Sequence, residues 1–299
     1  MTCSSGCYSA RELTPGESSL TSQQLGTRAI VTDVDIRIDD CMHFLGELAD
    51  ESVDVIVTDP AYSGMNQHMR FGHGRIVGHY GKPGNERWFS EFSDDAETYR
   101  RFLGECRRVL RNDRHIYIMF DSFSLLSLGA LVREHFDVKC VIVWDKVHLG
   151  MGHYFRRRHE QIVFASKGRR KVTRRDLHDV WPVTRIRNAI YPTQKPVELF
   201  SRMLTASAEP GFLICDPFTG SGSAAVAAMR HGCRFVGADI DPRAVRIARE
   251  RCAAVTATGL DPLESAVTEG RLRGRRRDQP AAGSSTGADG LSRAATPRA

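Results

Sequence analysis

The sequence predicts an α/β fold in which a mostly parallel, twisted sheet carries helices on both faces. Two observations lead to this fold class. Apolar runs of strand length alternate with helical patterns through the middle of the chain, an order typical of parallel sheets covered by their crossover helices. Five of the apolar runs also end in aspartate, which fits strands whose carboxyl ends meet at one edge of a sheet.

Each element is predicted from the spacing of its apolar residues. We expect strands at 34–38, 53–57, 115–120, 138–144, 161–165, 212–215 and 234–238. Helical periodicity falls at 96–110, 125–135, 196–207, 223–231 and 242–254. The flanking segments 1–32 and 257–299 are rich in Ser, Thr, Gly, Ala and Pro, so we expect them to be disordered around one domain at 33–256.

Composition narrows the class of protein. Of the 299 residues 41% are hydrophobic, which is ordinary for a globular protein with a substantial core. No apolar run reaches the roughly 20 residues needed to cross a bilayer, and the N-terminus lacks the apolar segment of a secretory signal. The cysteines are scattered without a CxxC pair, which indicates reduced thiols. We expect a cytoplasmic protein without a membrane segment or a bound metal.

The stretch VDVIVTDPAY at 53–62 places Asp59 and Pro60 directly after an apolar strand. Such an aspartate either caps the next helix or turn, or is held toward a ligand. Each strand-end aspartate alone is a common N-cap, but a set of them favours a ligand site at one sheet edge. The other members of the set are Asp39, Asp40, Asp121, Asp216 and Asp239.

The segment FLICDPFTGSGSAAVAAMRHGCRFVGADID reads as strand, glycine loop, helix, strand and acid. Gly220 and Gly222 allow close approach of the backbone to a ligand, and the helix from Ser223 presents free amides at its start. Asp239, at the end of the next strand, is placed to bind a ribose diol. The pattern is not the GxGxxG of dinucleotide sites, but it indicates an adenosine-containing cofactor.

DPAY and DPFTGSG, in this order, resemble the motifs of amino-group DNA methyltransferases that use S-adenosyl-L-methionine. Their catalytic motif is Asp/Asn/Ser-Pro-Pro followed by an aromatic residue, and in this chain it precedes the cofactor motif, as in the permuted β class. The similarity runs from about 35 to 254 and implies a circularly permuted, Rossmann-like methyltransferase fold. It also implies catalytic roles for Asp59, Pro60 and Tyr62. Ala61 departs from the family's second proline, which removes one φ constraint from the turn.

The resemblance also implies a cofactor-binding set. DDCMHF matches the family's entry segment that contacts adenine, and YPTQKPVELF matches its Thr-x-Lys-Pro segment near the cofactor. RRRHEQIVFASKG matches its late strand. The implied cofactor residues are Asp40, Cys41, Asp59, Thr193, Lys195, Asp216, Phe218, Gly220, Ser221, Gly222, Ser223, Asp239 and Ile240.

The resemblance gives the strand-end aspartate a chemical task. The lone pair of adenine N6 is delocalised into the ring, so the amino group must move toward tetrahedral geometry before it attacks a sulfonium methyl. The Asp59 carboxylate and the Pro60 carbonyl can accept its two hydrogens and favour that change. Asp59 is thus interpreted as an orienting acceptor, and Tyr62 as a flat surface for stacking an extruded base.

The net charge of +6 is concentrated in 156–187, which holds eleven Lys and Arg against three acids. The family resemblance places target recognition here, at about 166–190, and a long glycine-rich loop at 63–88 is interpreted as DNA contact or cofactor closure. A second basic cluster at 271–277 is interpreted as part of a solvated tail. The predicted DNA-binding residues are Arg70, Arg75, Arg156, Arg157, Arg158, Arg169, Arg170, Lys171, Arg174, Arg175, Arg185 and Arg187.

The leading hypothesis is therefore a bacterial or phage adenine-N6 methyltransferase acting on double-stranded DNA. Cytosine-N4 and RNA methylation are alternatives, although cytosine-N4 members more often carry Ser where this chain has Asp59. A silent nucleic-acid-binding protein on the same fold is a third reading, which the intact motifs disfavour. The short reading segment predicts a homodimer with a short palindromic site. No nuclease motif is evident in the sequence, which favours a solitary methyltransferase over a fused restriction enzyme; a separate partner endonuclease would not be visible in this chain.

Overall fold

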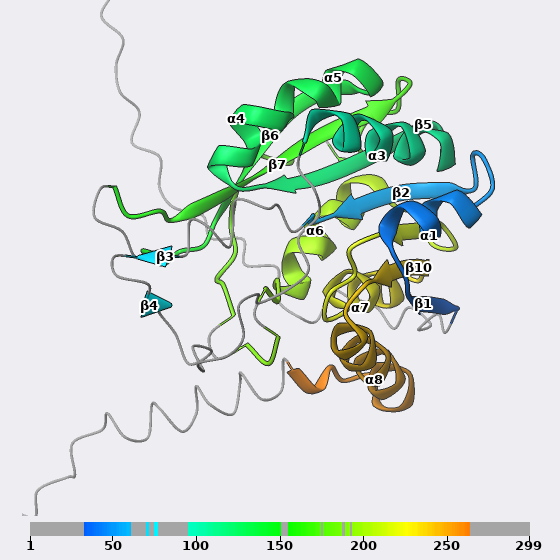
Figure 1. Ribbon diagram of the computed structural model, residues 1–299. Coiled ribbons are helices and arrows are strands. Elements are labelled where there is room, and N and C mark those ends of the chain that lie inside the picture. Colours follow the sequence, from blue (N-terminus) through cyan, green and yellow to red (C-terminus); the bar gives the residue numbers. More distant parts are fainter. Residues whose placement is uncertain are drawn as a thin grey trace, which may run out of the picture.

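The computed structural model describes residues 33–60, 70–71, 75–76, 95–150, 155–174, 176–186, 189–191 and 193–263. Its centre is an eight-stranded sheet in the order β1-β10-β9-β2-β5-β7-β6-β8 (Figure 1). These strands are β1 (Val34–Ile38), β2 (Val53–Thr58), β5 (Leu110–Phe120), β6 (Asp137–Asp145), β7 (His159–Lys167), β8 (Val180–Pro182), β9 (Leu213–Asp216) and β10 (Arg234–Asp239). A separate pair joins β3 (Arg70–Phe71) to β4 (Arg75–Ile76).

The strand directions confirm a mostly parallel sheet. β1, β10, β9, β2 and β5 are parallel neighbours, whereas β7 runs antiparallel to both β5 and β6. β2 and β9 are hydrogen-bonded neighbours although about 155 residues separate them in the chain. The predicted catalytic strand thus precedes the predicted cofactor strand in sequence and lies beside it in space.

Helices cover both faces of the sheet (Figure 1). One face carries α1 (Cys41–Glu47), α3 (Ala96–Val109), α4 (Ser122–Leu128) and α5 (Val132–His135), and the other carries α6 (Val197–Ser207), α7 (Ser223–Arg230) and α8 (Pro242–Thr258). Because successive side chains of a strand point to opposite faces of the sheet, the core has two parts. Val55 and Val57 of β2 pack under α6 and α7, while Ile56 packs under α3. None of the described helices is long and apolar enough to cross a membrane.

The helix predicted at 125–135 is interrupted. α4 begins at Ser122 because the Asp121 carboxylate accepts hydrogen bonds from the amides of Phe123 and Ser124. A 3-10 turn, η1 (Gly129–Leu131), then separates α4 from α5. Gly129 lies so close to Leu125 that a Cβ at this position would be 2.8 Å from Leu125 Cδ1.

Two further boundaries differ from the sequence-based expectation. The patterns do not predict α1, a seven-residue helix that Asp40 caps through the amides of Met42 and His43. At the other end, the predicted domain boundary at 256 falls inside α8, which continues to Thr258. Asp261 beyond it is 1% exposed, so the fold extends past the predicted boundary.

Candidate active site

One pocket opens at the edge of the sheet where β1, β2, β9 and β10 end. The aspartates at the ends of these parallel strands surround it, as the sequence pattern predicts. Apart from Gly222, every residue of the predicted cofactor set lies on the pocket wall. The wall consists of Asp39, Asp40, Cys41, Asp59, Tyr191, Thr193, Gln194, Lys195, Phe200, Asp216, Pro217, Phe218, Thr219, Gly220, Ser221, Ser223, Asp239, Ile240 and Asp241.

The glycine loop between β9 and α7 needs glycine at two positions. Gly222 has φ 81° and stands at the N-cap of α7, where a Cβ would lie 2.8 Å from Ala248 Cβ on α8. Gly220 has φ 53°, and its amide donates to Asp239 Oδ2 at 2.8 Å. The loop therefore bends tightly between β10 and α8, with its backbone against the pocket.

A buried arginine, which the sequence patterns do not single out, supports this loop. Arg251 on α8 is 2% exposed and forms an ion pair of 2.6 Å with the equally buried Asp261. Its Nη1 also donates to the backbone oxygen of Ser221 and to Ser223 Oγ at 3.1 Å. α8 and the segment after it thus fix the position of the loop.

The carboxylates of Asp216 and Asp239 both accept hydrogen bonds from backbone amides at the pocket. Burial raises the pKa of Asp216 well above its usual range, and the amide of Phe218 opposes this by donating to its carboxylate at 3.0 Å. Burial also raises the pKa of Asp239, against the amides of Asp241 and Gly220. Asp239 stands on the wall at the end of β10, the position from which an acid can bind ribose hydroxyls.

Asp59 follows β2 and is ion-paired to Lys195 through Oδ2. Burial raises the pKa of Asp59, while the Lys195 ammonium lowers it in opposition. Lys195 itself is joined to the glycine loop, because its backbone oxygen accepts from Ser223 Oγ at 2.7 Å. The resemblance placed Lys195 near the cofactor; the structure adds that its ammonium binds the predicted catalytic carboxylate.

The entry segment supplies Asp40 and Cys41 at the end of β1. Asp40 caps α1 and also lines the pocket, so its structural and predicted ligand-binding roles coexist. Burial raises the pKa of Cys41 to about 12, so its thiol stays protonated. Nearby, ligand atoms of Asp39, His43 and Glu47 lie within 4.8 Å of one another, the one such group among the described residues. Asp39 already binds His43 Nδ1 at 2.8 Å, and two of the three residues are exposed.

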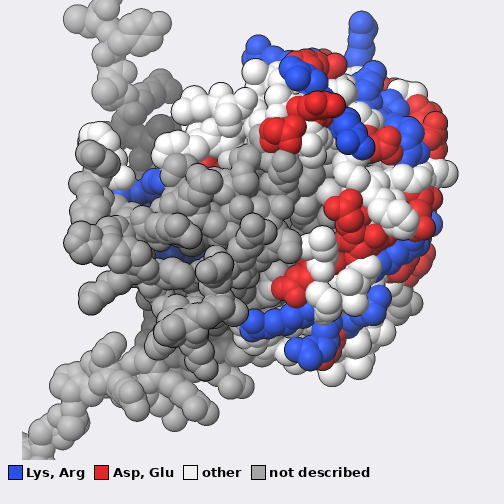
Figure 2. All heavy atoms as spheres, viewed as in Figure 1, with Lys and Arg blue, Asp and Glu red and all other residues white. Residues whose placement is uncertain are grey.

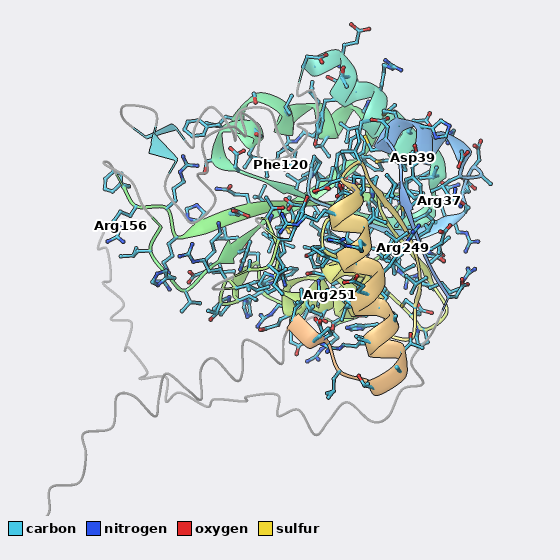
Figure 3. The ribbon with its side chains drawn as sticks, turned by 60° about the horizontal axis from the view of Figure 1, so that its bottom comes forward. Arg37, Asp39, Phe120, Arg156, Arg249 and Arg251 are labelled. Carbon is cyan, nitrogen blue, oxygen red and sulfur yellow. The ribbon has the colours of Figure 1, made fainter. Side chains whose placement is uncertain are left out.

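Some predicted DNA-binding residues lie at the pocket edge of the sheet. Arg156, Arg157 and Arg158 precede β7, whose first residues pair with the carboxyl ends of β5 and β6. Arg157 stacks over Phe123 at 5.0 Å, and Arg158 forms a bidentate pair with Asp145. Arg185 follows β8 on the same side. Figure 3 shows Arg156 on the far side of the domain from Arg37.

Other members of that set lie at the opposite edge of the sheet, so the predicted residues are divided between two ends of the domain. β7 is antiparallel to β5, so its end at Lys167 lies beside Arg114, near the amino ends of the parallel strands. Its nine residues span about 26 Å. Arg170 there pairs with Glu209 at 2.6 Å, and the Arg169 amide donates to Asp113. A duplex over the pocket would lie at the other end of β7 from Arg169, Arg170 and Lys171.

Acids accompany many of the surface cations. Arg174 pairs with Asp176. Figure 2 shows Lys and Arg interspersed with Asp and Glu over the described part of one face. The net charge of the chain therefore does not by itself locate a DNA-binding surface.

Several predicted residues fall outside what the structure describes. Tyr62, Arg175 and Arg187 are among them, as are most of the predicted loop at 63–88 and the predicted disordered segments, apart from 257–263. Of Arg70 and Arg75 only the backbone, in β3 and β4, is described. Their assigned roles stay predictions.

The pocket wall also contains residues that the motifs did not single out. Tyr191 donates to Asp241 Oδ2 at 3.2 Å, joining the segment before α6 to the N-cap of α8. The Oε1 atom of Gln194 is buried and has no protein partner among the described residues. Both residues lie in the motif YPTQKP, close to Lys195 in sequence. This proximity could have identified them as candidates for the pocket wall.

Comparison with known proteins identifies the family. A model of the DNA methylase family matches residues 53–250. The chain belongs to this family. The type II methyltransferase M2.DpnII of Streptococcus pneumoniae is 30% identical over 241 residues, covering 73% of this chain and 89% of the relative.

Solved structures agree on the fold of this DNA methylase. A complex of M1.HpyAVI with SAM matches at a TM-score of 0.53 with 17% identity, over 73% of this chain and 99% of the other. The cytosine-N4-specific PvuII DNA methyltransferase matches at 0.55 with 14% identity, over 81% and 92%. The predicted Rossmann-like methyltransferase fold is thereby confirmed.

Proposed function

We propose that this DNA methylase transfers the methyl group of S-adenosyl-L-methionine to N6 of an adenine extruded from double-stranded DNA. The observation that carries the proposal is Asp59. Its carboxylate lies at the carboxyl end of β2, on the wall of the pocket that also contains the glycine loop and Asp239. An acceptor of hydrogen bonds and a cofactor-binding loop thus face one space.

Asp59 and Pro60 supply the groups that the amino nucleophile requires. Lys195 occupies Oδ2 of Asp59, and no described residue donates to Oδ1, which leaves that oxygen for one amino hydrogen. The carbonyl of Pro60 is the proposed acceptor for the second. Together they favour the tetrahedral geometry in which N6 can attack. Proton loss from N6 follows the transfer, so Asp59 acts as an orienting acceptor.

The polar groups of the pocket support the assignment of the cofactor. S-adenosyl-L-methionine supplies a methyl group made electrophilic by its sulfonium. Asp239 is the proposed partner of the ribose hydroxyls, Asp40 and Cys41 of the adenine, and the Gly220–Gly222 backbone of the polar tail. Oε1 of Gln194, which no described residue donates to, is one further acceptor on a residue of the wall.

The test is expression in a methylation-deficient bacterium, followed by single-molecule sequencing of its genome. N6-methyladenine at one short motif would support the proposal, and N4-methylcytosine would replace it with the alternative from the same family. Absence of any modified base from wild-type protein that binds the cofactor would favour the silent binding protein.

We also propose a homodimer, because the described residues beside the pocket provide few side chains for base reading. A second subunit would extend the footprint, and two-fold protein symmetry would match a palindromic site. Light scattering of the free protein and of its DNA complex tests this. A monomer in both states, with a long asymmetric motif, would contradict it.

A further inference from the structure

A second ion pair lies beyond the pair formed by Asp59 and Lys195. Glu160, in β7, binds the ammonium of Lys146, which follows β6. Both pairs are largely shielded from solvent: the side chains are 25% exposed for Asp59 and Glu160, 13% for Lys195 and 23% for Lys146. The pair of Asp59 and Lys195 lines the pocket, and both members of the second pair act electrostatically on Asp59.

Strand alternation places both carboxylates on the same face of the sheet. Asp59 continues the side of Val57 on β2, and Glu160 continues the side of Ile162 on β7, and both apolar residues pack under α6. Lys195 precedes α6 on this face. Only β5 separates β2 from β7, so their axes are about 10 Å apart. One ammonium above β5 can act on both carboxylates.

We propose that Lys195 and Glu160 are positioning residues for methyl transfer, which hold Asp59 by Oδ2 and leave Oδ1 turned toward the target amino group. The inference rests on the proposed function and deepens it. A carboxylate fixed through one oxygen cannot rotate away from the amino hydrogen. Glu160 attracts the same ammonium from the other side, so Lys195 stays charged between the two carboxylates.

The neighbouring charges determine the sign of each perturbation. The groups acting on Asp59 are Lys195, Glu160 and Lys146, with Asp216 opposite on β9. Burial is the largest cause of the raised pKa of Asp59, Lys195 lowers it, and Glu160 raises it. Arg157 acts on Glu160, and Asp216 acts on Lys195. Removing the charge of Glu160 should therefore lower the pKa of Asp59, and removing that of Lys195 should raise it.

The experiment compares pH profiles of kcat for wild type, Glu160→Gln and Lys195→Gln. We expect the acidic limb to move to lower pH in Glu160→Gln and to higher pH in Lys195→Gln. In Lys195→Gln kcat should fall roughly 10- to 100-fold, the loss expected for one charge-assisted hydrogen bond. The KM for S-adenosyl-L-methionine should change much less than kcat.

Glu51→Gln is the matched control, because Glu51 pairs with Lys167 at the opposite end of β7. It should leave the acidic limb in place. Limbs that do not move, or that move together in both variants, would overturn the proposal, since general structural damage has no opposite signs.

A second measurement separates this inference from the proposed function. Titration of the ¹³C carboxyl signal of Asp59, assigned with Asp59→Asn, reports the same opposite shifts without any turnover. If wild type methylates no DNA, the proposed function fails while the titration still decides the arrangement of charges. Unchanged titration in an active enzyme would reject the positioning roles alone.

Discussion

Asp54 and Asp59 lie at the two ends of β2 and are bound in different ways. Asp54 is 2% exposed; its Oδ1 accepts from Arg111 at 2.9 Å and Arg114 at 3.1 Å, and its Oδ2 accepts from the Leu213 amide at 2.9 Å. Among the residues that the structure describes, Asp59 has one donor, Lys195, and it faces a pocket. The first carboxylate has both oxygens occupied by protein, whereas no described residue donates to Oδ1 of the second, which the proposed function assigns to a ligand.

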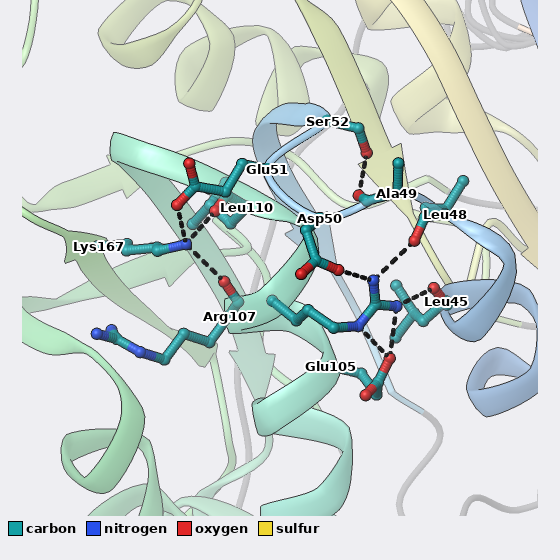
Figure 4. A network of polar contacts seen from close by, with 11 residues as sticks. Leu45, Leu48, Ala49, Asp50, Glu51, Ser52, Glu105, Arg107, Leu110 and Lys167 are labelled. Atoms are coloured by element: carbon teal, nitrogen blue, oxygen red, sulfur yellow. Dashed lines mark hydrogen bonds and ion pairs between the residues drawn. The ribbon is translucent and has the colours of Figure 1, made fainter.

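The same difference extends across the sheet. At the amino end, Lys167 donates to Glu51 and to the carbonyls of Arg107 and Leu110 (Figure 4). Arg108 likewise binds Glu105, Asp50 and two backbone carbonyls. At the carboxyl end, carboxylates line a cavity. Charged side chains whose hydrogen-bonding atoms all have protein partners stabilise the fold, while those with a free hydrogen-bonding atom are available for chemistry.

The largest effect is expected from replacing the two aspartates of β2 in turn. Asp59→Ala should lose methyl transfer by at least about a hundredfold, as for a missing transition-state acceptor, yet retain DNA binding and most cofactor binding. Asp54→Ala should instead lower the free energy of unfolding by about 1 to 3 kcal/mol, because it leaves the Leu213 amide without its acceptor and two partly exposed arginines without their ion pair. Near-normal turnover of Asp59→Ala would show that Asp59 is only a residue in a turn after the strand.

A second test compares two strand-end aspartates at the pocket edge. Asp239→Ala should weaken S-adenosyl-L-methionine binding by a factor of tens to several hundred, or about 2 to 4 kcal/mol, through lost charge-assisted hydrogen bonds. Asp121→Ala should cost about 1 kcal/mol of stability, because Asp121 caps α4, and leave affinity unchanged. Isothermal calorimetry decides: equal affinities for Asp239→Ala and wild type would remove Asp239 from the site.

The strand-end aspartates show how far the sequence predicts this molecule. The alternating pattern and the two motifs predicted the sheet, its permuted order and the pocket that collects Asp40, Asp59, Asp216 and Asp239. Local pattern could not separate ligand-facing acids from caps, because Asp121 caps α4 and Asp40 does both. That distinction depends on which helix begins beside each strand end.

The residues that sequence reasoning missed depend on strand direction and long-range contacts. Glu160 and Lys146 come together through an antiparallel pair, and Arg251 meets the glycine loop only after α8 has folded over α7. The reversal of β7 also separates Arg156 from Arg169, although both belong to one basic segment of the sequence. Spacing along the chain carries no information on these contacts.

A third test uses this separation of the basic residues. The double variant Arg156→Gln, Arg157→Gln should flatten the slope of log K against log salt by about two, since each lost phosphate contact removes about 0.9. Specific and random DNA should be weakened alike, because phosphate contacts carry no sequence information. Arg169→Gln, Lys171→Gln removes the same charge at the far edge and should change the slope less. The reverse order of the two effects would place the DNA on the amino end of the sheet.

The smallest expected effect is on protein stability and concerns His115, near the amino ends of the parallel strands. His115 is 1% exposed, lies 2.7 Å from Ser207 Oγ through Nδ1, and contacts the Arg170 carbonyl at 3.0 Å through Nε2. Burial lowers its pKa, against the opposing effect of that carbonyl. Below the unfolded-state pKa of about 6.5, the unfolded chain therefore binds more protons than the folded one, and stability must fall as the pH falls.

Between pH 7 and pH 5 the contribution of His115 should reduce the free energy of unfolding, by at most about 2 kcal/mol if the imidazole stays neutral in the folded state. Urea unfolding of wild type and His115→Gln at both pH values isolates it, because His135, whose pKa burial also lowers, is present in both proteins and cancels in the difference. The variant should start less stable and depend less on pH. An identical pH dependence in the two proteins would mean that His115 does not stay neutral in the folded state, and that a charged imidazole is tolerated even at the amino end of the sheet.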